Sequence, residues 1–292
     1  MKIIDTHLHI WNKEELSLPW LLGEGEVLNR NYSIRDYMDS ASAGEGFEVI
    51  GAVYVEVDAA RDHKEKENNW IISQCREPGS LFLGASISGY LDEEGFKEYL
   101  DRFPSSYVKG VRQVLHVPSA LPGTCLGETF FENVRYLGEK GMVFEGCVRN
   151  GELPDLYQLA KACPDTTIVL NHMGIVDPDI LSREQPSQEE KVYKETWLRN
   201  IRNLASLPNV VCKISGLNPA GAWNINTLRP AVEAALDHFG EDRIMYASNY
   251  PVCNVATKMA PWTDALIQMT QSRGIGFQNK LFYENAMRVY RL

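Results

Sequence analysis

The sequence lacks any hydrophobic segment of the length that a membrane span requires. No apolar run among its 292 residues is long enough to cross a bilayer. The amino terminus, MKIIDTHLHIW, has no signal-peptide core and begins with a strand-like segment. The six cysteines are scattered without CxxC spacing, and several lie in apolar patterns typical of reduced, buried thiols. We therefore expect a cytoplasmic protein that does not bind a membrane.

Clusters of positive charge are also missing. The net charge is −10 and no run of Lys or Arg offsets it locally, which argues against nucleic acid and anionic membranes as partners. Neither GxGxxG nor GxxxxGK[ST] follows any strand-like run, which disfavours an open doubly wound sheet. The net charge does not restrict the choice of a small-molecule substrate, because a local Arg or His cluster can outweigh the electrostatic field of the whole protein. The oligomeric state is open too, a homo-oligomer included.

Eight short β-rich runs alternate with helical patterns along the chain. Most are continuously apolar, as expected of strands covered on both faces, and they occupy residues 2–5, 49–57, 81–87, 107–114, 142–148, 166–171, 210–215 and 243–248. Between them, sets such as Phe130, Val134 and Leu137 show the i, i+4, i+7 spacing of amphipathic helices. The alternation predicts one α/β domain over residues 1–292, a (β/α)₈ TIM barrel with its active site at the C-terminal ends of the strands.

Polar side chains gather where the predicted strands end. The first strand ends in Asp5-Thr6-His7-Leu8-His9, and histidines spaced i, i+2 on an extended chain point the same way. With His172 at the end of the sixth strand, they could bind Zn²⁺ or polarise a carbonyl group without a metal. His116 has no such placement, and we expect a surface or helix-end role for it. The other strand-end candidates are Glu56, Asp58, Arg112, Gln113, Arg149, Lys213, Ser215, Ser248 and Asn249.

Six segments in order carry a family resemblance: DTHLHIW, VKGVRQVLH, LNHMG, NVVCKISGL, RIMYASNYPVCN and FYENAMRVYRL. They resemble the amidohydrolase superfamily (amidohydrolase family 2), and within it the sugar-lactonase branch of fuconolactonases, rhamnonolactonases and pyrone-dicarboxylate lactonases. The resemblance implies a hydrolase of carbohydrate metabolism that opens a lactone of a sugar acid or a related cyclic ester. It implies that the histidines polarise the lactone carbonyl and that Arg112 binds a carboxylate or hydroxyl of the substrate. A structural ion pair is the other interpretation of Arg112.

The eighth strand departs from the family pattern. The family usually carries an aspartate there as metal ligand and general base, whereas this chain has Asn249. An amide cannot take up a proton near neutral pH and is a poor ligand for Zn²⁺. Strand four likewise has Gln113 where histidine is common, and strand five has no histidine to bind a metal.

Three explanations of Asn249 remain open. The chain is an enzyme without a metal that uses Glu56, Asp58 or a histidine as base, or a lactone isomerase that needs no activated water. The third is a non-catalytic sugar-acid binding protein, or a chain in which Asp was changed to Asn to trap substrate. We favour the first, with no essential cofactor; Zn²⁺ at His7, His9 and His172 is the alternative.

Other features around the predicted barrel mouth have two interpretations each. Glu56 and Asp58 are close enough for like charge to raise one pKa, unless Glu56 pairs with Arg112 or Lys213. Trp223 could stack on a sugar or fill a hydrophobic gap. Residues 11–33 and 177–195 are loops or lids, and Trp11 and Trp20 could line the pocket. The predicted substrate-binding residues are Asp58, Gln113, Arg149, Lys213 and Trp223.

Overall fold

Eight parallel strands form the centre of the molecule. The computed structural model describes residues 1–104 and 106–292, and its strands lie in chain order, each paired with the next. The strands are β1 Lys2–Leu8, β2 Glu48–Val55, β3 Phe82–Ser88, β4 Val108–Arg112, β5 Val143–Gly146, β6 Ile168–Leu170, β7 Val210–Ile214 and β8 Ile244–Tyr246.

Hydrogen bonds between the first and last strands close the ring. Thr6 Oγ1 donates to the carbonyl of Tyr246 (2.6 Å), and the backbone N–H of Asn249 donates to the carbonyl of His7 (3.0 Å). The buried Asp5 carboxylate accepts the backbone N–H of Ser248 (2.9 Å). An open sheet would leave β1 and β8 unpaired, so the (β/α)₈ barrel predicted from the sequence is confirmed.

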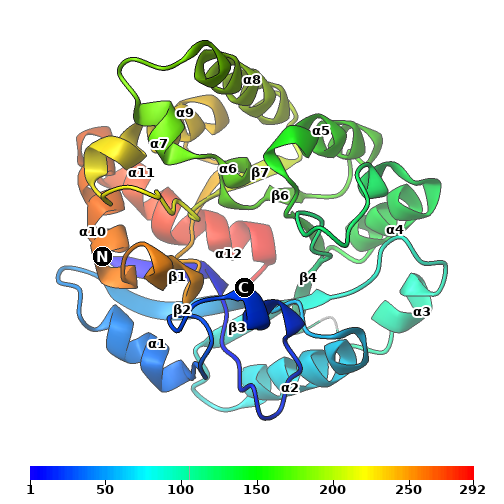
Figure 1. Cartoon of the computed structure of the whole chain (residues 1–292). Helices are drawn as coiled ribbons and strands as arrows, with labels where there is room; N and C mark the ends of the chain where they lie inside the picture. Colours follow the sequence, from blue (N-terminus) through cyan, green and yellow to red (C-terminus); the bar gives the residue numbers. More distant parts are fainter. Residues whose placement is uncertain (105) are drawn as a thin grey trace.

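Helices surround the barrel on its outside (Figure 1). The apolar positions predicted on one helix, Trp197, Ile201 and Leu204, are all buried, because that face packs inward as the spacing requires. The helices are α1 Ile34–Ala41, α2 Lys64–Arg76, α3 Phe96–Leu100, α4 Glu128–Glu139, α5 Leu153–Ala162, α6 His172–Ile175, α7 Pro178–Ser182, α8 Gln188–Ala205, α9 Ile225–Phe239, α10 Met259–Thr270, α11 Ile275–Asn279 and α12 Asn285–Tyr290. None of those within residues 1–104 and 106–292 combines the length and hydropathy of a bilayer-crossing helix.

The inside of the barrel is layered. Successive inward positions on a strand are two residues apart, as are Val143 and Glu145 in β5 and Cys147 directly after it. Val143 belongs to an apolar layer with Val53, Val169, Val211 and Met245, which α12 covers with Val289 and Tyr290. Above this layer the inward positions become polar, which places charged side chains between an apolar base and the barrel mouth.

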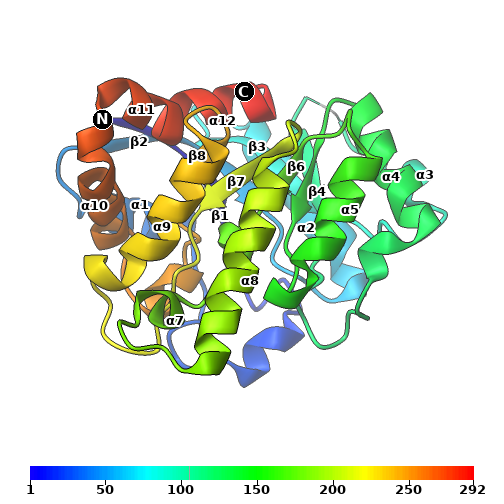
Figure 2. The ribbon, with the colours of Figure 1, turned by 90° about the horizontal axis from the view of Figure 1, so that it is seen from above.

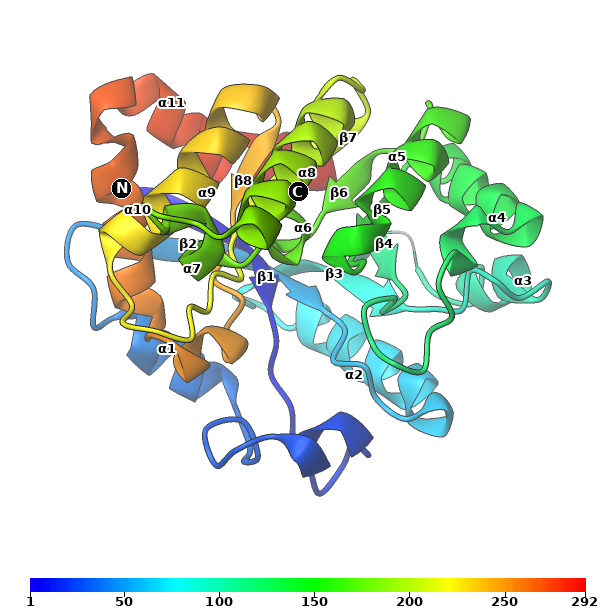
Figure 3. The same ribbon diagram turned by 45° about the horizontal axis from the view of Figure 1, so that its top comes forward.

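The two ends of the barrel differ in what covers them. In Figure 2, α11, α12 and the N-terminus lie at one end, and α7 and the segment after β1 lie at the other. Figure 3 shows that segment extending beyond the barrel from the end of β1. Strands β6 and β8 end before His172 and Asn249, so these predicted site residues lie at the mouth, beyond the ends of the strands.

Candidate active site

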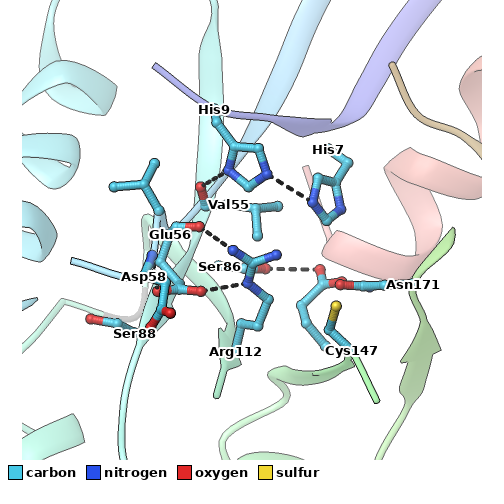
Figure 4. A network of polar contacts seen from close by, with 12 residues as sticks. His7, His9, Val55, Glu56, Asp58, Ser86, Ser88, Arg112, Cys147 and Asn171 are labelled. Carbon is cyan, nitrogen blue, oxygen red and sulfur yellow. Dashed lines mark hydrogen bonds and ion pairs between the residues drawn. The ribbon is translucent and has the colours of Figure 1, made fainter. Parts of the chain in front are cut away.

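His7 and His9 face each other at the end of β1. Their Nε2 atoms are 3.1 Å apart, and Nδ1 of His9 lies 2.7 Å from the carbonyl oxygen of Val55. A carbonyl only accepts, so His9 carries its proton on Nδ1 and its Nε2 accepts. Figure 4 shows the His9 ring between the Val55 carbonyl and His7. Burial lowers the pKa of His9 to about 3, with Arg112 adding to the effect, which keeps the ring neutral.

Lys213 determines the proton on His7. Its Nζ lies 3.3 Å from Nδ1 of His7 and pairs with both oxygens of Glu145, at 2.8 and 2.9 Å. An ammonium group only donates, so His7 accepts at Nδ1 and donates from Nε2 to His9. Burial, followed by the charge of Lys213, holds the pKa of His7 well below its ordinary value. The order of protons from Lys213 through His7 to His9 is therefore fixed.

The donor set at His7 and His9 fits a resident metal poorly. A metal-binding histidine normally donates its second N–H to a carboxylate or carbonyl, as His9 does, but the second nitrogen of His7 faces an ammonium group. The position that would supply a third ligand carries the amide of Asn249, a poor ligand for Zn²⁺. Within residues 1–104 and 106–292, no group of three His, Cys, Asp or Glu side chains is arranged to hold a metal ion.

Glu145 anchors the polar layer below the histidines. Besides Lys213, it accepts hydrogen bonds from Ser86 (2.9 Å), Asn171 (2.6 Å) and Tyr290 (2.6 Å). The Lys213–Glu145 pair is fully buried, and such a pair requires this many partners to offset its desolvation. Burial outweighs the charge of Glu145 and lowers the pKa of Lys213 from its ordinary value.

His172 lies on an unusual turn after β6. His172, Met173, Gly174 and Ile175 all have positive φ angles, and each non-glycine residue in this left-handed region costs about 1–2 kcal/mol. The turn places the His172 ring 4.4 Å from that of His7, measured between centroids. Nδ1 of His172 lies 2.8 Å from Oγ of Ser215, which leaves Nε2 for a ligand. Burial, together with nearby Arg112 and Lys213, holds the pKa of His172 well below its ordinary value.

Glu56 and Arg112 form a buried ion pair. Nε of Arg112 donates to the Glu56 carboxylate and Nη2 to the Glu56 carbonyl, both at 2.5 Å (Figure 4). The other carboxylate oxygen accepts the backbone N–H of Asp58 at 2.8 Å. Burial alone would raise the pKa of Glu56, but Arg112 and Lys64 lower it to about 2. Of the two interpretations of Glu56, the structure supports the ion pair with Arg112. The like charge of Asp58 does not raise the pKa of Glu56, which is lowered instead.

A cavity of about 530 Å³ lies beside these groups at the barrel mouth. Asp58 faces it with a side chain that is 33% exposed and pairs with Lys64 at 3.2 Å. Asn249 also faces it, from a backbone with φ of 56°, and no residue within 1–104 and 106–292 is hydrogen-bonded to its side chain. The remaining lining includes His9, Arg112, His172 and the apolar side chains Trp11, Trp20, Leu28, Val57, Val114, Val117, Pro118, Ile175, Val252 and Val255.

Of the predicted substrate-binding residues only Asp58 belongs to this lining, and the predicted catalytic residues His7 and Glu56 lie outside it as well. Gln113 bonds the backbone N–H of Leu91 and the Asp92 carboxylate, and Lys213 lies beneath His7. Arg149 donates to the carbonyls of Val117 and Ala120 and so holds the loop after β4. Trp223 packs against the hydrophobic core, with its indole nitrogen buried and unpaired among the described residues.

His116 and Cys147 are a pair of cavity residues that sequence reasoning did not bring together. Cys147 Sγ lies 3.3 Å from Nδ1 of His116, and both line the cavity. For Cys147, the sequence signal that could have identified it as a cavity residue was its inward position, two residues after Glu145. His116 gave none, because it lies in a loop whose course depends on contacts with β5.

The whole arrangement has counterparts among known proteins. The amidohydrolase family model matches residues 4–292. The chain belongs to this family. The resemblance seen in the six sequence segments is thus confirmed, and with it the expectation of a hydrolase.

Relatives align over nearly the whole chain. An uncharacterized protein of Sinorhizobium fredii is 28% identical over 99% of this chain and 98% of its own length. L-fucono-1,5-lactonase of Burkholderia multivorans is 24% identical over 99% and 96%. L-rhamnono-gamma-lactonase of Scheffersomyces stipitis is 23% identical over 100% and 99%. A solved amidohydrolase of B. multivorans with bound zinc shares the fold, with a TM-score of 0.83, 23% identity and full coverage of both chains.

Proposed function

We propose that the protein hydrolyses the lactone of a sugar acid without an essential metal. The observation that carries this proposal is the pair of hydrogen-bond donors at the cavity floor, His172 Nε2 and Arg112. Nη1 of Arg112 has no acceptor among the residues at 1–104 and 106–292, and both side chains line the cavity. A carbonyl oxygen placed between them would gain the electrostatic stabilisation that acyl transfer requires as its charge develops.

The fixed protons divide the roles of the three histidines. The Nε2 of His9 accepts from His7 and has no hydrogen to donate to a substrate. The His7–His9 pair therefore does not donate to the substrate and has a structural role in the site. His172 polarises the carbonyl from Nε2 when the Ser215 hydroxyl donates to its Nδ1. This assignment narrows the expectation that all three histidines act on the lactone carbonyl.

Hydrolysis also needs a group that takes up the proton of water. Asn249 cannot do so, and Glu56 is held ionised in its pair with Arg112. Two carboxylates line the cavity, the exposed Glu24 and the partly exposed Asp58. We assign Asp58 the role of proton acceptor, because it follows β2 in the same strand-end cluster as Arg112.

The charges around the cavity favour an uncharged lactone. Arg112 pairs with Glu56, Lys64 with Asp58 and Lys213 with Glu145, so the three cations are each matched by a carboxylate. A substrate carboxylate would find no unmatched cation among them, whereas ring hydroxyls can bond these groups without added charge. Trp11 and Trp20 supply apolar walls for the carbon face of a sugar ring.

A panel of lactones, followed with a pH indicator and by NMR, tests the proposal. Hydrolysis releases acid, and we expect an acid signal with uncharged sugar-acid lactones. Lactone isomerisation is the second candidate, because the Asn249 amide could position a hydroxyl but not activate water. It would change the NMR spectrum without releasing acid. Silence in both assays would overturn both functions and favour a binding protein.

A further inference from the structure

Cys147 occupies an inward position directly after β5. It lies one layer above Glu145 and is 1% exposed to solvent, yet it lines the cavity together with Arg112 and His172. Figure 4 draws its side chain together with that of Arg112. Its Sγ lies 3.3 Å from Nδ1 of His116, within hydrogen-bonding range for sulfur. A thiol and an imidazole therefore meet at the wall of the site that would bind the lactone.

The loop that carries His116 is held against β5 from both sides. The backbone N–H of Leu115 donates to the carbonyl of Cys147 at 3.1 Å. Arg149 donates from Nη2 to the carbonyls of Val117 (2.5 Å) and Ala120 (2.6 Å) and pairs with Glu152 at 2.7 Å. Contacts on both sides of His116 thus fix its distance from the sulfur.

The surroundings of Cys147 differ from those of the other cysteines. Burial raises the pKa of Cys75 and Cys125 to about 12 and that of Cys163 to about 11. Burial acts on Cys147 as well, but His116 and Arg112 outweigh it and lower its pKa below the ordinary value. The pKa of His116 is raised, mainly by Cys147. A thiolate facing an imidazolium is the form that attacks a carbonyl carbon.

We propose that Cys147 is the nucleophile that opens the lactone and that His116 is its acid–base partner. This inference rests on the proposed lactone hydrolysis. The thiolate sulfur bonds to the carbonyl carbon, the ring C–O bond breaks, and the ring oxygen takes the Nδ1 proton of His116. The product is a thioester on Cys147 that retains every atom of the lactone. The hydrolytic base missing at Asn249 is then not needed for the first step.

Water completes the reaction in a second step. Its oxygen bonds to the thioester carbon, one of its protons goes to Asp58, and the C–S bond breaks to release the thiolate. Asp58 passes this proton to His116, which restores the starting pair. The sugar acid leaves and ionises, so one proton is released to solvent for each lactone consumed.

The test combines kinetics with intact-protein mass spectrometry. We expect Cys147→Ser to lower kcat by at least ~100-fold, because it removes the nucleophile, while the matched Cys163→Ser leaves kcat unchanged. Cys163 is also buried but follows α5, before β6, at the opposite end of the barrel. In the Asp58→Asn variant, where the second step is slowed, a lactone that the wild type hydrolyses should add the mass of the unopened lactone to the intact protein. Digestion of that protein should place the added mass on the peptide that contains Cys147. Circular dichroism of each variant verifies folding.

A second measurement examines the pair itself. Iodoacetamide should alkylate Cys147 at pH 6 in the wild type, and His116→Gln should slow that alkylation, because the thiolate loses its partner. Wild-type kcat in Cys147→Ser, or no adduct in Asp58→Asn, overturns the covalent route and leaves lactone hydrolysis standing. Failure of the wild type to release acid from any lactone overturns both, whatever the alkylation rate.

Discussion

Gly216 leaves the space that the His172 ring occupies, and replacing it with alanine should disable the site. Gly216 follows β7 with a φ of +71°. A Cβ built there would lie 2.6, 2.7 and 2.8 Å from Cβ, Cγ and Nδ1 of His172. These atoms cannot move aside easily, since they belong to the base of a side chain on the left-handed turn. The added methyl group therefore requires either the His172 ring or the loop after β7 to shift.

The size of the effect follows from two separate costs. Alanine at this φ costs about 1–2 kcal/mol, and forcing a methyl group into a filled space adds about 1–3 kcal/mol. A displacement of the reacting group by ~1 Å lowers the rate by ~100-fold. We therefore expect Gly216→Ala to lower the free energy of unfolding and to reduce kcat/KM by about two orders of magnitude.

Gly240→Ala is the matched control for this prediction. Gly240 has a nearly equal φ of +69°, and nothing lies within 4 Å of the Cβ position. It ends α9, before β8, far from the barrel mouth. Urea unfolding measures the loss of stability in each variant, and lactone hydrolysis measures the displacement of His172. Equal kcat/KM values for the two variants would refute the reasoning.

Three further predictions concern catalysis, pH and specificity. His172→Ala should lower kcat by ~100-fold or more with an unchanged circular dichroism spectrum, while His238→Ala, on α9, should retain full activity; a fully active His172→Ala would remove His172 from the mechanism. Burial, followed by the charge of Glu56, raises the pKa of Glu67 to about 8, so folding retains its proton and stability is lost as the pH rises from about 4.5 towards 8. Glu67→Gln should abolish this loss in thermal melts at pH 5 and pH 8, and parallel pH dependence in both proteins would contradict the assignment. Uncharged sugar-acid lactones should show kcat/KM at least ~10-fold above that of lactones with a carboxylate, and the reverse order in a steady-state comparison would rule out charge matching at the cavity floor.

The fold was largely predictable because its signals are local. Continuously apolar runs identified the eight strands, and the helical spacing of residues such as Trp197 and Ile201 identified the faces that pack on them. The strand ends were less certain. The runs at 166–171 and 243–248 extend past β6 and β8, because apolar composition does not show where the backbone leaves the ladder at His172 or Asn249.

The side-chain contacts of the site were only partly predictable. The i, i+2 spacing of His7 and His9 indicated that both point into the barrel, and the structure places their Nε2 atoms 3.1 Å apart. The partner of Glu56 was open between Arg112 and Lys213, and the structure pairs it with Arg112. No local pattern could show that His116 meets Cys147, since that contact depends on how the loop after β4 crosses β5.

By itself, the sequence determined the barrel, the family and the absence of a strand-eight carboxylate, because residue identity and periodicity carry all three. Only the tertiary structure decided which protons and charges remain available. Lys213 reaches His7 from another strand and sets its tautomer, and Arg112 and Lys64 keep Glu56 ionised. Electrostatic interactions in a buried site depend on distances between residues far apart in the chain. The chemistry of this site therefore follows from its three-dimensional arrangement.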